Sequence, residues 1–390
     1  MIPYGHQLIG EDDIDAVVQV LRSDFLTQGP AVPRFEEALA RYCGAPHAVA
    51  TCNATAALHL ACLALGLGPG DRLWTSPITF VASANCGRYC GAEVDFVDID
   101  PHTWTLCPQA LERKLVEAER DGRLPKIVVA VHLCGHSCDL RAIHALSARY
   151  GFRIIEDASH AIGARYLGEP VGCCRYSDIT VFSFHPVKII TTGEGGMALT
   201  RDAALAERMA RLRSHGITRD PARMSGPPDG PWYYEQTELG FNYRMTELQA
   251  ALGTSQLKHL DAWVAQRNAL AHRYAAALDG LPLTIQQVAP DCRSAYHLFI
   301  IRLLQGRGAR PRREVFEALR ASGIGVNVHY IPLYHQPGYR NPGAAGRCPE
   351  AERYYAGAIT LPLFPALGEA DQDHVVQALR GSLQPPGTSS

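Results

Sequence analysis

Short apolar runs rich in β-branched residues alternate with stretches of helical periodicity over the first half of the chain. Seven runs are expected to be strands: Ala48–Cys52, Arg72–Ser76, Glu93–Ile99, Lys126–Leu133, Phe152–Glu156, Asp178–Phe184 and Gly196–Thr200. Helical periodicity lies between most of them, at Ala56–Leu67, Val81–Cys90, Pro108–Glu119 and Leu140–Tyr150. This alternation predicts an α/β domain with a mostly parallel sheet. The last two runs have no helix between them, which allows a mixed sheet.

The pattern changes after residue 201. Two helices are expected at Ala203–Ser214 and Glu247–Leu278, and the second is long enough to bridge two domains. The remaining pattern predicts a smaller α+β domain with strands at Tyr296–Leu304 and Gly325–Val328 and helices at Pro311–Ser322 and Gln372–Leu383. The predicted organisation is a large domain at 1–250, a small domain at 251–384 and a disordered tail at 385–390.

The segment from Gly216 to Gln236 is rich in proline and glycine and has no periodicity. Loops of this length in compact domains are usually functional or disordered. We therefore expect a mobile flap at an active site.

Composition narrows the classes of function. The chain has 390 residues, 47% of them hydrophobic, and a formal net charge of −2, which suits two packed domains and disfavours nucleic acid as a partner. The N-terminus lacks the pattern of a signal peptide, and the apolar segments are shorter than the roughly 20 residues of a membrane span. We expect a cytoplasmic protein that contacts no membrane.

The twelve cysteines do not form the paired C-x2-C spacing of a zinc site. His132 and His136, near Cys134 and Cys138, could in principle hold a metal. Small buried side chains in a reducing compartment are the favoured interpretation, and we expect no metal.

Candidate chemistry gathers just after the predicted strands, where open α/β sheets bind their ligands. The stretch Asn53-Ala-Thr-Ala-Ala57 opens a helix whose backbone N–H groups could bind a phosphate, although Asn53 or Thr55 could equally be an ordinary helix cap. Phe80, after the second strand, could stack on a flat heterocycle or belong to the core.

The fifth and sixth strands are followed by ionisable groups. Asp157 could accept a hydrogen bond from a protonated ring nitrogen, or cap the next turn. Ser183 is positioned to reach a phosphate, and Lys188 lies in an apolar, glycine-flanked stretch where burial can make an amine nucleophilic. Phosphate donors, an aromatic plate, a carboxylate and a lysine together are typical of a site for pyridoxal 5′-phosphate (PLP).

These motifs, with Thr191-Thr-Gly-Glu-Gly-Gly196, resemble the DegT/StrS-type sugar aminotransferases of PLP fold type I, from Tyr4 to about residue 380. The resemblance implies an aspartate aminotransferase-like fold with a seven-stranded, mostly parallel sheet. It also implies pyridoxamine 5′-phosphate as the form that carries the amino group. Cofactor-binding residues would be Ala54, Thr55, Phe80, Asp157, His160, Ser183 and Lys188, joined by Asn242 from the partner subunit of a homodimer with shared active sites.

Within this family the chain resembles the aminotransferases of pseudaminic acid biosynthesis, in Ser23–Pro30, Phe182–Lys188 and Asn327–Tyr330. This similarity implies L-glutamate as amino donor, released as 2-oxoglutarate, and C4 of UDP-2-acetamido-2,6-dideoxy-β-L-arabino-hexos-4-ulose as acceptor. The product would be UDP-4-amino-4,6-dideoxy-N-acetyl-β-L-altrosamine. The implied substrate contacts are Tyr4, Asp24, Phe25, Leu26, Thr27, Asn327, Val328, His329 and Tyr330.

Three other functions are compatible with the same fold. A PLP-dependent sugar 3-dehydratase would carry histidine in place of Lys188, so the lysine argues against it. A non-catalytic regulator would have lost Lys188, Asp157 or Ser183, and all three are present. An aminotransferase for another nucleotide-linked 3- or 4-keto-6-deoxy sugar remains open.

Overall fold

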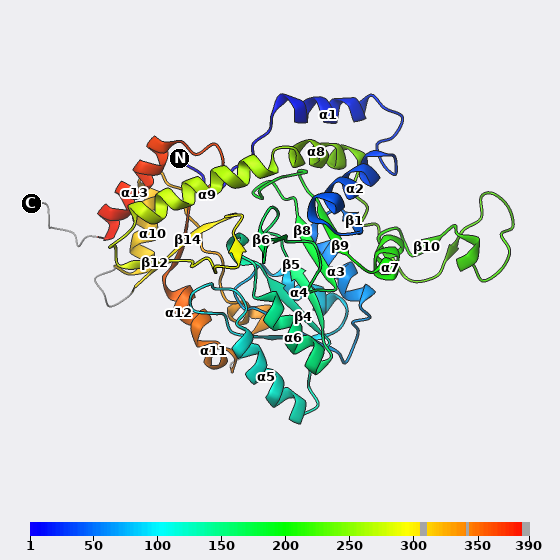
Figure 1. Ribbon diagram of the computed structural model, residues 1–390, viewed down its shortest axis with the longest axis horizontal. Helices are drawn as coiled ribbons and strands as arrows, with labels where there is room; N and C mark the ends of the chain where they lie inside the picture. The colour runs from blue at the N-terminus through cyan, green and yellow to red at the C-terminus, as the bar shows by residue number, and fades with distance from the viewer. Residues whose placement is uncertain (305–309, 341–342, 384–390) are drawn as a thin grey trace, which may run out of the picture.

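The computed structural model describes residues 1–304, 310–340 and 343–383. The predicted tail at 385–390 lies outside the described residues. A seven-stranded sheet forms the centre of the molecule (Figure 1), in the order β1-β9-β8-β5-β4-β2-β3. Its strands are β1 (His47–Thr51), β2 (Arg72–Thr75), β3 (Glu93–Phe96), β4 (Ile127–Val131), β5 (Arg153–Asp157), β8 (Ile179–Ser183) and β9 (Gly196–Thr200).

All seven predicted strands are therefore present, and the sheet is mixed. Strand β9 pairs antiparallel with both β1 and β8, whereas the remaining neighbours pair in parallel. Strand β9 runs antiparallel to β8 because a loop joins the two strands directly, whereas a parallel pair would need a crossover connection.

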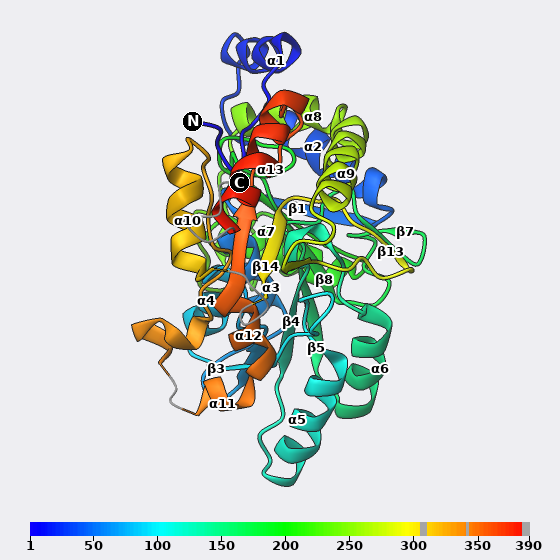
Figure 2. The ribbon, with the colours of Figure 1, turned by 90° about the vertical axis from the view of Figure 1, so that its left-hand side faces the viewer.

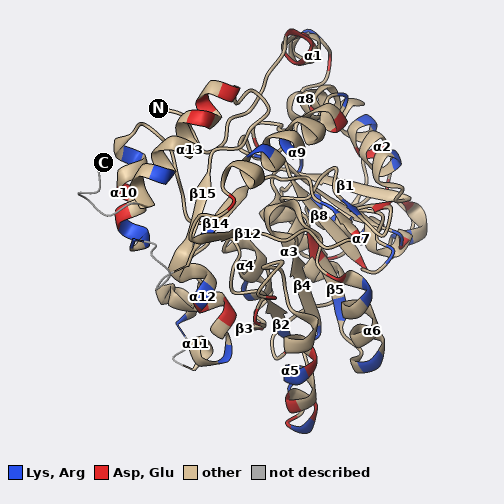
Figure 3. Ribbon diagram, turned by 60° about the vertical axis from the view of Figure 1, so that its left-hand side comes forward, with Lys and Arg blue, Asp and Glu red and all other residues tan. Residues whose placement is uncertain are grey.

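Helices cover both faces of this sheet, which explains why its strands are continuous apolar runs. In β4, Ile127 and Val129 pack in one cluster with α3 (Ala54–Ala64), α4 (Ala82–Tyr89) and α7 (Ala203–Arg213). The alternate residues Val128 and Ala130 pack with α5 (Pro108–Arg120) and α6 (Leu140–Tyr150) on the opposite face. Charges of both signs are spread over the outer helices such as α5 and α10 (Figure 3).

A second, three-stranded antiparallel sheet lies in the C-terminal part. It contains β12 (Leu283–Ile285), β14 (Phe299–Leu303) and β15 (Ala358–Leu361). Helices α10 (Arg312–Ala321) and α13 (Glu369–Leu383) stand beside it (Figure 2), and together they enclose a separate apolar core. The predicted domain boundary at residue 250 remains a prediction.

Two C-terminal predictions were wrong in detail. The helix expected at Glu247–Leu278 is two helices, α8 (Glu247–Leu257) and α9 (Leu260–Ala277). The break falls at Lys258 and His259. Helix α8 packs on α1, and the Nε2 atom of His259 lies 2.8 Å from Asp12 of α1. The strand expected at Gly325–Val328 forms only a single bridge, between Asn327 and Thr360.

The pattern also missed several elements, most of which are short. The helices among them are α1 (Glu11–Leu21), α2 (Ala31–Cys43), α11 (Ala344–Arg347), α12 (Pro349–Gly357) and the 3-10 turns Leu133–Gly135, Pro221–Arg223, Leu333–His335 and Pro337–Tyr339. The strands among them are β6 (Arg165–Tyr166), β7 (Glu169–Pro170), β10 (Ile217–Thr218), β11 (Glu235–Gln236) and β13 (Cys292–Arg293), together with β12 and β15 of the second sheet. None of the described helices is long and apolar enough to cross a membrane.

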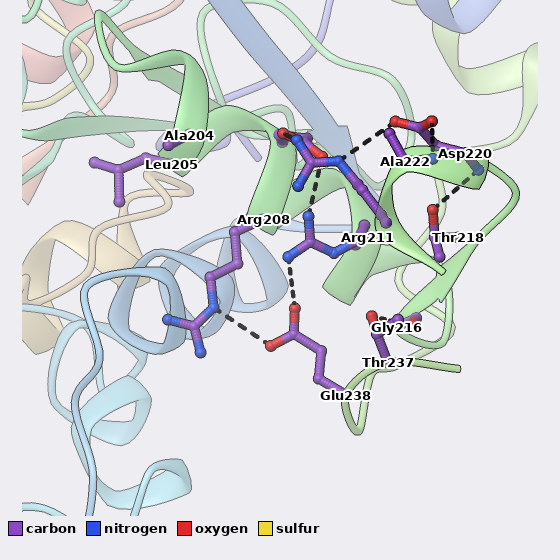
Figure 4. A network of polar contacts seen from close by, with 12 residues as sticks. Ala204, Leu205, Arg208, Arg211, Gly216, Thr218, Asp220, Ala222, Thr237 and Glu238 are labelled. Atoms are coloured by element: carbon purple, nitrogen blue, oxygen red, sulfur yellow. Dashed lines mark hydrogen bonds and ion pairs between the residues drawn. The ribbon is translucent and has the colours of Figure 1, made fainter. Parts of the chain in front are cut away.

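The loop predicted as a flap projects from the body of the molecule as an arm closed by β10 and β11 (Figure 1). Its base is fixed to α7 by Glu238, whose carboxylate accepts from Arg208 at 3.3 Å and from Arg211 at 3.1 Å (Figure 4). No residue of the arm lines the cavity that contains Lys188 in the same chain.

A buried carboxylate holds α2 against α8. Glu247, 1% exposed, accepts hydrogen bonds from the backbone N–H groups of Ala31 at 2.5 Å and Val32 at 3.2 Å. These are first-turn donors of α2, which have no partner within the helix. Its own backbone N–H donates to Leu26, so Glu247 fixes the segment before α2 as well.

We expect Glu247→Ala to lower the free energy of unfolding by about 2–3 kcal/mol, because two N–H groups would be buried without an acceptor. Urea denaturation measures this loss. Glu247→Gln keeps one acceptor and should lose less. The control is Glu37→Ala, since Glu37 pairs with Arg41 at the surface, where an ion pair contributes at most about 1 kcal/mol. Equal losses for the two alanine variants would contradict the assignment.

Candidate active site

One cavity of about 580 Å³ lies at the carboxyl ends of the sheet strands, between the two parts of the chain. Residues after β1, β5 and β8 form its base, and the segment 327–330 closes it from the C-terminal part. Of the residues predicted from the sequence, the cavity brings together Tyr4, Ala54, Thr55, Phe80, Asp157, His160, Ser183, Lys188, Asn327, Val328, His329 and Tyr330.

The start of α3 is suited to bind an anion. The side chain of Asn53 accepts from Ala56 N–H at 2.8 Å, so the predicted helix cap is present. The cap leaves the first two N–H groups, those of Ala54 and Thr55, without an intrahelical partner, and they line the cavity together with Ser183. Two N–H donors at the positive end of a helix dipole, with a hydroxyl, fit a phosphate group.

Gly196 allows the strands to approach this helix start. It pairs with Thr51 on one side and Ser183 on the other. A Cβ atom at Gly196 would lie 2.5 Å from the backbone nitrogen of Ala54 and 2.5 Å from the carbonyl carbon of Asn53. Any larger residue would therefore displace the start of α3.

Asp157 ends β5 as a carboxylate held at both oxygens. Its Oδ2 accepts from Ser83 Oγ at 2.6 Å, and its Oδ1 accepts from Ser159 Oγ at 2.6 Å. The side chain is only 6% exposed and lines the cavity. Such a fixed carboxylate can accept a hydrogen bond from a protonated ring nitrogen. Sequence reasoning missed Ser83 as its partner, because the two residues are distant in the chain.

Lys188 lies in the loop between β8 and β9. That loop is closed by Phe184, whose backbone N–H donates to Gly195 at 2.9 Å and whose carbonyl accepts from Thr192 at 3.0 Å. Within the part of the chain that the structure describes, the Lys188 amine makes no hydrogen bond or ion pair. Burial lowers the pKa of this amine to about 8, while the negative charge of Asp157 opposes the shift. A neutral amine is a nucleophile and a base.

Aromatic side chains surround the amine and carboxylate. Phe80, 59% exposed, lies at the mouth of the cavity, with its ring centroid 6.3 Å from that of Tyr330. His160 accepts from Cys134 N–H at its Nδ1 (3.3 Å), so its proton lies on Nε2, 3.2 Å from the Tyr330 hydroxyl. Burial lowers the pKa of His160 well below its usual value, which keeps this imidazole neutral.

Tyr4 is brought to the cavity by the N-terminal segment. Ile2 pairs in parallel with Ile324, and the ring of Tyr4 lies 5.3 Å from that of His329. His329 is fixed by Thr360 Oγ1 at 2.8 Å from its Nδ1. His297 also lines the cavity, and sequence reasoning missed it because it lies within an apolar run.

Five predicted site residues lie outside this cavity in their own chain. The exposed residues Asp24, Phe25, Leu26 and Thr27 lie in the segment between α1 and α2. Asn242 is exposed and forms a bridge with Ser214 after α7. A role for these residues in catalysis requires a second subunit.

The histidines and cysteines considered for a metal have other partners. His132 Nε2 lies 2.8 Å from Glu156, and His132 Nδ1 accepts from Cys138 N–H at 3.1 Å. His136 Nε2 accepts from Ala289 N–H at 2.9 Å. No cluster of metal-ligating side chains occurs among the described residues.

The sequence profile of the DegT/DnrJ/EryC1/StrS aminotransferase family matches residues 7–380, and the chain belongs to this family. It is 38% identical over 383 residues to the spore coat polysaccharide biosynthesis protein SpsC of Bacillus subtilis, covering 97% of this chain and 96% of that protein.

Solved structures agree with the fold. The chain is similar to Helicobacter pylori PseC, an aminotransferase involved in the biosynthesis of pseudoaminic acid, with a TM-score of 0.89 and 30% identity over 98% of this chain and 99% of that one. It is also similar to the sugar aminotransferase Spr1654 of Streptococcus pneumoniae in its PMP form, with a TM-score of 0.88 and 29% identity over 98% and 99% of the two chains. The predicted fold type I architecture is confirmed.

The family is PLP-dependent, and the protein is a nucleotide-sugar aminotransferase. The cavity fits this cofactor on the chemistry of its donors. Two free helix N–H groups and a hydroxyl suit the phosphate, a fixed carboxylate suits the ring nitrogen, and a neutral amine suits the aldehyde carbon.

We expect Gly196→Ala to raise the dissociation constant of PLP at least about tenfold, because its Cβ would push away the first N–H groups of α3. Titration of the apoprotein with PLP, followed by absorbance, measures the constant. The matched control is Gly68→Ala, where a Cβ meets no atom within 4 Å. A dissociation constant within twofold of wild type for Gly196→Ala would refute the explanation.

The lowered pKa of Lys188 predicts how covalent PLP binding depends on pH. Below pH 8 the amine is mostly protonated and reacts slowly, and above pH 8 the rate should level off, well below the range of an ordinary lysine. Asp157→Asn should move this midpoint lower, because the carboxylate charge favours the protonated amine. Stopped-flow absorbance across pH 6–11 provides the test, with Lys188→Ala as the blank. A midpoint near 10 would contradict the prediction.

Proposed function

We propose that this protein transfers the amino group of L-glutamate to C4 of UDP-2-acetamido-2,6-dideoxy-β-L-arabino-hexos-4-ulose, giving UDP-4-amino-4,6-dideoxy-N-acetyl-β-L-altrosamine. The observation that carries the proposal is the position of 327–330 and Tyr4 across the cavity from Lys188, in a fold similar to that of PseC. The segment 327–330 is one of the three in which the sequence resembles the pseudaminic acid enzymes.

In this proposal Lys188 binds PLP covalently and also moves a proton. The chemistry that bound PLP supplies is electron withdrawal from the amino-bearing carbon, so that a proton can leave it. Once the amino group of the donor has displaced it from the cofactor, the amine of Lys188 would be free to take up this proton and to return it, and it would act in the opposite sense for the keto sugar. The lowered pKa of Lys188 supports both tasks.

The other cavity residues bind and orient the cofactor. Asp157 keeps the proton on the ring nitrogen, with Ser83 and Ser159 fixing its two oxygens. The backbone N–H groups of Ala54 and Thr55 and the hydroxyl of Ser183 bind the phosphate. Phe80 and His160 flank the ring.

The substrate-binding residues come from two subunits. Tyr4, Asn327, Val328, His329 and Tyr330 contact the sugar from within the chain. Because Asp24–Thr27 and Asn242 are exposed and outside the cavity, we propose that they complete the site of the partner in a homodimer. Asn242 would then reach the phosphate group of the PLP bound in the partner subunit.

A second acceptor is supported by a specific observation. The chain is more similar in sequence to SpsC, a spore coat polysaccharide biosynthesis protein, than to PseC, at 38% against 30% identity. The alternative acceptor is another nucleotide-linked 3- or 4-keto-6-deoxy sugar, and it would use the same cofactor residues.

The absorption spectrum of the PLP-loaded protein tests the proposal in two half-reactions. L-Glutamate should convert the band of lysine-bound PLP to that of pyridoxamine phosphate. The L-arabino 4-keto sugar should then restore the first band faster than its D-xylo epimer or a 3-keto dTDP-sugar. Restoration by a different keto sugar alone would support the alternative acceptor. Failure of L-glutamate to change the band would overturn the donor assignment.

A further inference from the structure

His297 is the one cavity-lining imidazole, within the described ranges, whose ring nitrogens have no partner. Its Nδ1 is buried without a hydrogen bond, and no bond is formed by Nε2. His160 and His329 line the same cavity. The ring of His160 forms hydrogen bonds with Cys134 and Tyr330, and the ring of His329 forms one with Thr360. Nε2 is not among the buried atoms without a partner, so it is the ring nitrogen that can reach a ligand in the cavity.

The backbone and one face of His297 are nevertheless tightly held. Its N–H donates to Cys134 at 2.9 Å, and its carbonyl accepts from Arg267 at 3.2 Å. Arg267 is 1% exposed and also donates to the carbonyls of Tyr296 and Leu363, so it joins the start of β14 to the segment after β15. The His297 ring lies 4.4 Å from that of His160, centroid to centroid.

The surroundings decide the protonation state of His297. Burial and the nearby His160, Lys188 and Arg267 lower its pKa well below the usual value, so the ring is neutral. A neutral ring carries one proton. On Nδ1, this proton would be a buried donor without an acceptor, which is costly. On Nε2, the nitrogen that is not enclosed, the proton is available to the cavity.

We propose that His297 is a substrate-binding residue whose Nε2–H donates a hydrogen bond to an oxygen of the bound substrate. This inference rests on the proposed transamination, in which both substrates pass through this cavity. The acceptor is an oxygen atom, supplied either by the carboxylate of the amino donor or by the keto sugar. Because hydrogen bonds fix the backbone of His297 and its ring packs against that of His160, this bond requires little further ordering.

The test compares His297→Leu with His297→Gln, whose amide keeps an N–H donor at a similar reach. In single-turnover half-reactions, the leucine variant should weaken apparent binding of one substrate about 10- to 100-fold. The dissociation constant of PLP should stay within twofold of wild type, and His297→Gln should recover most of the loss. An effect confined to L-glutamate identifies the carboxylate as acceptor, and one confined to the keto sugar identifies the sugar.

The proposal would be overturned if His297→Leu bound each of the two substrates with the same apparent affinity as the wild type. So would a glutamine variant as impaired as the leucine variant, since that indicates a structural role. ¹⁵N NMR of the holoenzyme gives a readout without turnover, and a His297 ring protonated at Nδ1 would also overturn it. Failure of the sugar assignment is distinguishable, because wild-type protein would then react with L-glutamate but not with the L-arabino 4-keto sugar.

Discussion

The close approach of β9 to the start of α3 is the constraint on which the site depends. Gly196 lies between Thr51 and Ser183 in the sheet. Because it has no side chain, the backbone of Asn53 and Ala54 can pack directly against it. The helix therefore begins directly above the strand ends, with two free N–H groups beside a hydroxyl. The antiparallel course of β9 also returns the chain after Lys188, which fixes the loop that carries the amine.

The electrostatics of the cavity follow from burial. The cavity contains the Lys188 amine, whose pKa is lowered, and the Asp157 carboxylate, which two serines fix. The imidazoles of His160, His297 and His329 line the same cavity, and burial lowers their pKa values as well. Neutral imidazoles can donate and accept hydrogen bonds without adding positive charge near Lys188. This leaves Asp157 as the main charge that acts on the amine.

Arg267 has a different task, since no carboxylate accepts its hydrogen bonds in the described part of the chain. Its guanidinium donates to three carbonyls from two segments of the C-terminal part. It thereby fixes the wall that includes His297 opposite the strand ends of the large sheet. Glu247 plays the equivalent part for the first turn of α2. In both cases a buried side chain on a helix satisfies backbone groups of a distant segment and fixes that segment to the helix.

The sequence by itself determined the large sheet, because buried strands are continuous apolar runs that helical periodicity separates. It also identified Asp157, Ser183 and Lys188, because residues after parallel strands gather at one edge. Only the tertiary structure decided that His297 and Ser83 belong to the site and that Asp24–Thr27 and Asn242 lie away from it. It also revealed the short strands and the break before α9. These features depend on contacts between residues far apart in the chain, such as Ser83 with Asp157 and Asp12 with His259, for which local periodicity carries no signal.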